Sequence, residues 1–132
     1  MSKAKLDRTV WCNKGWLPIF YGFCPSEAAW QREMRRLRIP NEPYPKTAGN
    51  VTHFGNGHAA ECLIVTVAKH NQPALRVIGI LAHEATHVWQ VICDAIGERD
   101  PSAEFEAYSM QAITQELIAA YEATRGKLCH GR

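Results

Sequence analysis

Two histidines and a glutamate stand close together past the middle of this chain, in the segment His83-Glu84-Ala85-Thr86-His87. On a helix, residues four apart lie one turn above each other on the same face. Two imidazoles in that position can bind one zinc ion through their ring nitrogens, at about 2.0–2.1 Å each. Glu84 lies beside that face, where it can take a proton from a metal-bound water without being a ligand. The spacing therefore predicts a zinc site with a carboxylate base next to it.

A second interpretation needs no metal. His83 and His87 are then core histidines that hydrogen-bond to backbone, and Glu84 is a surface residue. We favour the metal, because the motif is complete, lies in a helical pattern and is followed by a candidate third ligand.

The sequence around the motif predicts one long helix from Pro73 to Gly97. Asn71 can cap its start, Pro73 suits a first turn, and Gly97 is typical of a helix end. The intervening residues are apolar on nearly every side, which predicts a buried helix. Two histidines and a glutamate inside such a helix are costly to bury without partners, and a metal would supply the partner.

A second long helix is predicted after a short loop, with Asp100 as its cap and Pro101 in its first turn. A short loop between two helices predicts antiparallel neighbours. The apolar stripe of this helix consists of Met110, Ile113, Leu117 and Tyr121. Extending that stripe back by one turn reaches Glu106, which we therefore predict as the third zinc ligand.

Glu104 is the alternative ligand. It falls on a more polar face of the same helix, shared with Tyr108, Gln111 and Gln115, so Glu106 is preferred. A third possibility is that both carboxylates are surface residues in the first helical turn, where the helix dipole favours negative charge.

The first seventy residues predict one strand, one short helix and a hairpin. In chain order they are strand Trp16–Phe23, helix Glu27–Leu37 capped by Ser26, an extended proline-rich connection over 39–49, strand Asn50–Phe54, a turn at 55–57 and a return strand over 58–69. The strongest strand pattern is at 61–67. His53 and His58 flank the turn, and we interpret them as exposed hairpin residues in preference to site residues.

Composition indicates one soluble globular domain over residues 1–132, with a flexible arm at 1–10 and a frayed tail at 125–132. The net charge of +2 is too small to demand a polyanionic partner. No apolar run reaches membrane-spanning length, and no secretory leader follows the N-terminus, so we expect a cytoplasmic protein without a membrane partner. The five cysteines are odd in number and lack a C-x-x-C pair, which argues against a disulfide framework and against a cysteine zinc site.

The helix at 27–37 carries Arg32, Arg35 and Arg36, which together with nearby basic residues could bind nucleic acid. The same helix also carries Glu27 and Glu33. We therefore interpret its polar side as a solvated helix face, and we do not expect a nucleic-acid partner.

These residues resemble the zinc metallopeptidases called gluzincins, which have H-E-x-x-H on one helix and a glutamate ligand on the next. His83, Glu84 and His87 match the first motif, and Glu106 follows His87 after eighteen intervening residues. The helix with HEA-x-H-x-WQ also resembles small uncharacterised phage and prophage proteins. The resemblance covers 61 to about 121. It implies an α+β, minimal zincin-like domain, with a small antiparallel sheet, a buried motif helix and a second long helix packed antiparallel to it.

One part of the resemblance is incomplete. Gluzincins similar to thermolysin place a small residue three positions, and an aspartate four positions, after the ligand glutamate. Counted from Glu106, Ser109 fits but Met110 replaces the aspartate, so the outer-shell partner of a zinc histidine is missing. Counted from Glu104, the two positions hold Ala107 and Tyr108. The third ligand therefore stays open between the two glutamates.

The resemblance implies a zinc metallopeptidase that cleaves a peptide or protein substrate. Glu84 would be the base, and by analogy with zincins the strand at 61–67 would be the sheet edge that pairs with the substrate. The alternative is a non-catalytic binding module, for protein or nucleic acid, with a structural metal. Glu84 favours the enzyme, because a structural site has no use for a carboxylate that does not bind the metal.

Overall fold

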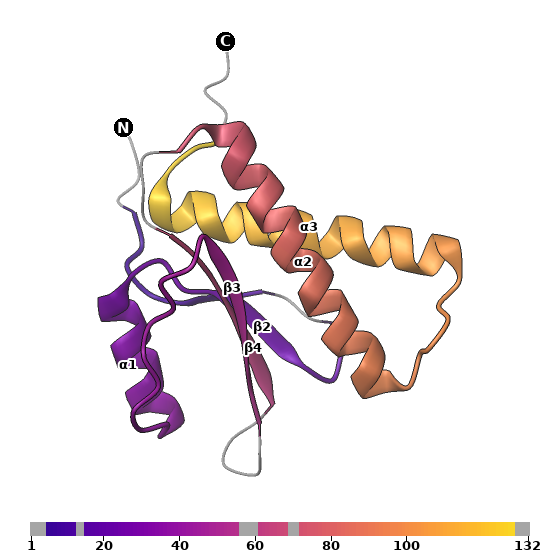
Figure 1. Cartoon of the computed structure of the whole chain (residues 1–132), viewed down its shortest axis with the longest axis horizontal. Helices are drawn as coiled ribbons and strands as arrows, with labels where there is room; N and C mark the ends of the chain where they lie inside the picture. Colours follow the sequence, from indigo (N-terminus) through magenta and orange to yellow (C-terminus); the bar gives the residue numbers. More distant parts are fainter. Residues whose placement is uncertain (1–4, 13–14, 56–60, 69–71, 129–132) are drawn as a thin grey trace.

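The computed structural model describes residues 5–12, 15–55, 61–68 and 72–128. In chain order, the elements of this part are β1 (Val10–Trp11), β2 (Phe20–Phe23), α1 (Glu27–Leu37), β3 (Gly49–Phe54), β4 (Cys62–Val67), α2 (Ala74–Ile96) and α3 (Ala103–Arg125) (Figure 1). The fold class is α+β, as predicted.

The sheet is mixed, and the prediction of an antiparallel sheet was wrong. Its strand order is β1-β2-β4-β3, in which β2 and β4 are parallel while β1 and β3 pair antiparallel at the two edges. The predicted hairpin pairing of β3 with β4 is confirmed, and most of the predicted turn at 55–57 lies outside the described residues. After β2, α1 and the proline-rich connection carry the chain to the far edge, and the hairpin then places β4 beside β2. The strand patterns predict β2, β3 and β4, but they predict neither β1 nor this order.

β4 lies in the centre of the sheet, so the prediction that it forms the substrate-pairing edge was wrong. Its residues are all buried: Cys62 and Ile64 pack with the core under α1, whereas Leu63, Val65 and Val67 belong to the core under α2 and α3. A strand covered on both faces has a continuous apolar sequence. The strength of the strand pattern at 61–67 was therefore a sign of a central position, and the edge beside α2 is β3.

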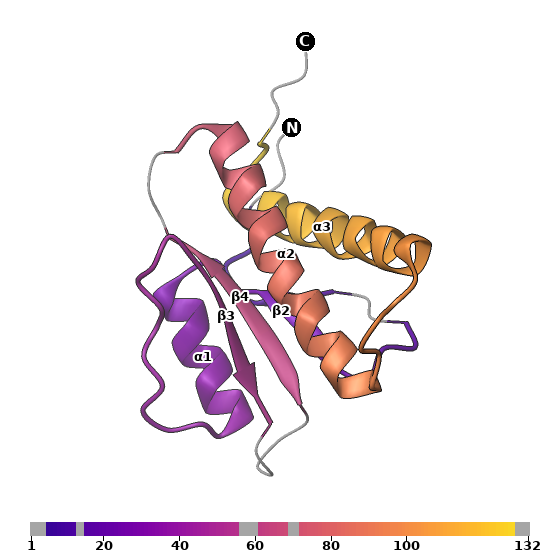
Figure 2. The same cartoon turned by 45° about the vertical axis from the view of Figure 1, so that its right-hand side comes forward.

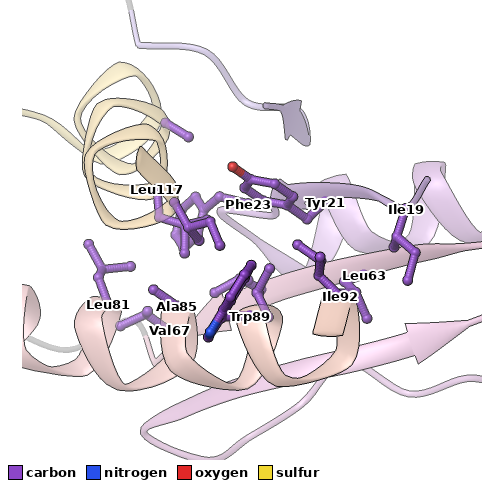
Figure 3. Packing of buried hydrophobic residues seen from close by; sticks show 14 of the residues in the cluster. Ile19, Tyr21, Phe23, Leu63, Val67, Leu81, Ala85, Trp89, Ile92 and Leu117 are labelled. Atoms are coloured by element: carbon purple, nitrogen blue, oxygen red, sulfur yellow. The ribbon is translucent and has the colours of Figure 1, made fainter. Parts of the chain in front are cut away.

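The helices cover the two faces of the sheet unequally. Figure 2 shows α1 against one face and α2 with α3 against the other. On the second face, Leu81, Ala85, Trp89 and Ile92 of α2 point at sheet residues that include Tyr21 and Leu63, with Leu117 of α3 beside them (Figure 3). This larger core fixes the rotation of α2 about its axis, and hence the direction in which its polar residues point.

α2 is buried on one side only, which corrects the prediction of a buried helix. Its inward side holds Val77, Leu81, Ala85, Val88 and Ile92, whereas Leu75 in the first turn is 81% exposed. α3 runs back obliquely across α2 and does not lie alongside it (Figures 1 and 2). A crossing helix covers less of its neighbour than a parallel one, so one side of α2 stays open.

The predicted helices agree closely with the observed ones, since their signals are local. α1 has the predicted bounds, and the Ser26 hydroxyl accepts a hydrogen bond from the Ala29 amide at 3.1 Å. α2 ends before Gly97, which adopts a left-handed conformation with φ of 74°. Its start differs from the prediction: the helix begins at Ala74 with Pro73 in the capping position, so Pro73 is not in the first turn and Asn71, which lies outside the described residues, is not the cap.

Several boundaries differ from the prediction, among them the starts of α3 and β2. α3 is capped by Ser102, whose hydroxyl accepts from the Phe105 amide at 3.3 Å, and not by Asp100. Both are good capping residues, and the sequence does not indicate which one ends the loop. β2 begins at Phe20, later than the predicted Trp16, after the proline at position 18.

The described parts of both chain ends contact the domain. The Leu6 amide donates a hydrogen bond to the Ala123 carbonyl at 3.0 Å, and Leu128 is buried against the larger core. Within the described ranges, none of the helices combines the length and the apolar character that a bilayer span requires.

Candidate functional site

His83 and His87 lie next to each other on the open side of α2. Their ring centroids are 4.9 Å apart, and the ring planes are inclined at 73°. Both residues are exposed, so they are not the core histidines of the metal-free interpretation. Two exposed imidazoles one helical turn apart can direct ring nitrogens at a common ion.

Glu84 lies against Gly49 of β3, where α2 meets the edge of the sheet, and is only 5% exposed. Burial raises the pKa of its carboxyl above the ordinary value, while His83 and His87 act in the opposite direction and more weakly. Among the described residues we find no donor that hydrogen-bonds to this carboxylate. Burial thus makes this carboxyl bind a proton more readily, and a general base has to be able to accept one.

Gly49, the first residue of β3, makes room for that carboxylate. A Cβ atom at Gly49 would lie 2.6 Å from Oε2 of Glu84 and 2.6 Å from Cγ2 of Ile80. Both distances are far shorter than a van der Waals contact between such atoms. A larger residue here would therefore force the Glu84 carboxylate and the Ile80 side chain to move, because the edge strand lies against α2 directly beneath the motif.

A cavity of about 560 Å³ opens between β3 and α2. Gly49, Val51 and His53 alternate along β3 and so share the strand face that is directed toward α2. The remaining lining residues are Asn50 of β3 and His83, Glu84, His87, Gln90, Val91 and Asp94 of α2. The two histidines and the buried carboxylate thus lie in one cavity, beside an edge strand.

Gln90 holds the ring of His87 in one orientation. The Oε1 atom of Gln90 is 3.0 Å from Nδ1 of His87. Because an amide oxygen only accepts hydrogen bonds, Nδ1 carries the proton in this contact. In the neutral ring Nε2 then keeps its lone pair, which is the form that binds a metal.

No protein-family model, curated protein or solved structure matches this chain. Its function therefore has to be inferred from its own residues. Those residues place the predicted base and two predicted ligands together in a cavity.

Glu106, the predicted third ligand, lies elsewhere. Nε1 of Trp89 donates a hydrogen bond to Oε2 of Glu106 at 3.0 Å. Trp89 projects about 200° around the helix from His87, at roughly 100° per residue. Neither Glu106 nor Glu104 lines the cavity. Within the described residues, no three or more histidine, cysteine, aspartate or glutamate side chains are grouped to hold a metal ion.

His53 lies in the cavity and is also exposed, as the hairpin interpretation predicts. Its Nε2 atom is 2.5 Å from Oε2 of Glu61, and both side chains are nearly half exposed. His58, the other histidine of the hairpin, lies outside the described residues.

Three cavity residues were missed by the sequence analysis. Gln90 and Asp94 follow His87 by three and seven residues, and that helical spacing alone would have placed them on its face. Gly49 had no comparable signal, because its role depends on a contact with a residue thirty-five positions away.

We expect Gly49→Ala to destabilise the protein by about 1–3 kcal/mol, the typical cost of forcing an extra methyl group into a closely packed site. The matched control is Gly79→Ala in α2, where an added Cβ meets nothing within 4 Å. In a helix that control should be neutral or stabilising, by about 0.5–1 kcal/mol. Urea unfolding measures both. If Gly49→Ala were as stable as the parent, β3 would not be closely packed against Glu84.

Proposed function

We propose that this chain is a zinc-dependent metallopeptidase with a zincin-like fold that resembles the gluzincins. The observation that carries the proposal is the position of Glu84. This carboxylate is buried against Gly49, between two exposed histidines, in a cavity beside an edge strand. A buried carboxylate next to two potential ligands has a purpose in hydrolysis, whereas a structural metal site gains nothing from it.

His83 and His87 would hold the zinc ion, and Glu106 or Glu104 remains the proposed third ligand. The donor chemistry fits, because imidazoles one turn apart suit zinc and the His87–Gln90 contact leaves Nε2 free. When bound, zinc would supply a Lewis acid that polarises the substrate carbonyl and lowers the pKa of water. For Glu106 to take part, its carboxylate has to leave Trp89.

Glu84 would accept the proton of the attacking water and pass it to the leaving amine. Its environment supports both steps. Burial raises the pKa of the carboxyl, so the proton is held long enough to be delivered. Gly49 limits where the carboxylate can go, which keeps it beside the histidines.

The substrate would pair with β3 as an added strand. β3 is the sheet edge that borders the cavity, and β4 occupies its other side. The free N–H and C=O groups of an edge strand are a template for an extended peptide. A peptide bound there would pass over His83 and Glu84.

The alternative function is a non-catalytic binding module, for protein or nucleic acid, with a structural metal. Its nucleic-acid form has less support from α1. Arg32 forms an ion pair with Asp7, and Arg36 forms one with Glu33. Two of the three arginines on that helix are thus already paired with carboxylates. The peptidase is the better supported of the two functions.

We expect tag-free protein to contain one zinc ion per chain, and the double variant His83→Ala/His87→Ala to contain none. Both imidazoles are exposed on the cavity side, so their removal takes away ligands without opening the core. Elemental analysis after gel filtration measures the content. Chelation should also lower the melting temperature of the parent, since a ligand of the native state stabilises it by mass action. Full zinc retention by the double variant would refute the site.

The third ligand is tested by Glu106→Gln against Glu104→Gln. We expect Glu106→Gln to weaken zinc binding severely and Glu104→Gln to leave it nearly unchanged. Glutamine can still accept the hydrogen bond from Trp89, so the first change removes charge without breaking that contact. Zinc affinity by competition with a chromogenic chelator measures both. The reverse order would assign Glu104. Unchanged zinc affinity in both variants would mean that α3 supplies no ligand. His53 and Asp94, which line the same cavity, would then be the next candidates.

We expect Glu84→Gln to fold, to bind zinc like the parent, and to lose peptide hydrolysis by about 10²–10⁴-fold, the usual contribution of a general base. The change keeps size and shape and removes the ability to accept a proton. Turnover of a peptide library measures activity, and the zinc content of both proteins is the control. Undiminished turnover in the variant would leave Glu84 without its proposed role.

A further inference from the structure

The cavity over the motif continues in the opposite direction along α2. A second cavity of about 470 Å³ is lined by Thr47, Ala48, Gly49, Arg76, Gly79, Ile80, His83 and Glu84. It shares Gly49, His83 and Glu84 with the first. The two form one groove between α2 and the β3 edge, and the candidate catalytic residues lie at its middle.

The two ends of this groove carry opposite charges at matched positions. Arg76 lies seven residues before His83, and Asp94 lies seven residues after His87. Seven residues are nearly two full turns, so all four side chains share one face of α2. From the middle of the motif, each charge is nine residues away, or about 13 Å along the helix axis.

Both charges are available to a bound molecule. Arg76 is exposed, and its Nε atom donates to the neutral amide oxygen of Gln72 at 2.8 Å. Asp94 is exposed as well. In the described ranges, neither side chain takes part in an ion pair. The His53–Glu61 pair, which also lies toward the Asp94 end, is neutralised internally when His53 is protonated.

β3 gives the groove a direction. Gly49 at its start lies against Glu84 and borders both cavities, while His53 near its end borders only the cavity that contains Asp94. The strand thus runs from the Arg76 side of the groove toward Asp94. Antiparallel pairing is slightly more stable per residue than parallel pairing. A peptide added to β3 in that way has its N-terminal half over Asp94 and its C-terminal half over Arg76.

We propose that this groove selects extended peptides with a basic side chain three or four residues before the cleaved bond and an acidic side chain three or four residues after it. At about 3.3 Å per residue, four residues of a strand cover the distance from the motif to either charge. The inference rests on the proposed peptidase function and adds the substrate class to it.

The experiment compares three peptide pools with the same randomised uncharged centre. One carries lysine on the N-terminal side and aspartate on the C-terminal side, the second has the order reversed, and the third has serine at both positions. We expect the zinc-loaded protein at low salt to cleave the first pool about tenfold faster than the third, and the second pool more slowly than either. Each exposed charge pair is worth roughly two- to fivefold, and salt should reduce the difference.

Charge reversal provides the internal test. The double variant Arg76→Glu/Asp94→Lys should prefer the second pool over the first. Arg35→Glu is the matched control, because this exposed arginine lies on α1, across the sheet from the groove. It should keep the parent's preference. If the double variant did not invert the preference between the first two pools, the proposal would be wrong.

The remaining outcomes separate this inference from the peptidase function. Equal cleavage of all three pools would refute the charge selectivity and leave the peptidase intact. Cleavage of none would refute the peptidase. In that case, fluorescence anisotropy with the same pools and the Glu84→Gln variant still tests the groove. Binding without a preference between the pools would overturn the selectivity as well.

Discussion

The contact between the Glu84 carboxylate and the Cα of Gly49 is the constraint on which the rest of the site depends. Burying part of a carboxylate is costly, so this contact has to be held by the packing around it. Leu81 and Ala85, one on each side in sequence, anchor α2 in the larger core. With Glu84 directed at the sheet, the neighbouring histidines must point outward into the groove. The direction of one buried side chain thus determines the direction of the other two.

The sequence predicted those features that depend on neighbouring residues. α1 has the predicted bounds because its cap and apolar spacing lie within eleven residues, and β3 pairs with β4 because the chain between them is short. The parallel pairing of β2 with β4 joins segments that α1 and β3 separate in the chain. No local pattern encodes that pairing, so the sequence indicates neither the parallel arrangement nor the central position of β4.

The prediction for Glu106 likewise depends on one local feature and one long-range feature. Its stripe correctly indicated the face of α3 that meets α2, because the carboxylate does contact Trp89 on that helix. The residue of α2 that lies opposite depends on the angle at which the two helices cross, and the crossing angle depends on side chains along the whole interface. A periodic pattern shows which face of a helix meets its neighbour. It does not show the angle at which the two helices cross. The short loop predicts two antiparallel neighbours, whereas α3 crosses α2 obliquely.

The polar side chains of the groove are regularly spaced because one long helix, α2, carries them. Arg76, His83, His87 and Asp94 belong to one helix of twenty-three residues, so their separations along the axis are set by helix geometry and not by loops. β3 borders the same groove, and its contact at Gly49 fixes the strand against the helix. A site built between two regular elements keeps its spacing more firmly than one built from loops. Recognition by charges at fixed distances from the motif is therefore physically reasonable in a domain of only 132 residues.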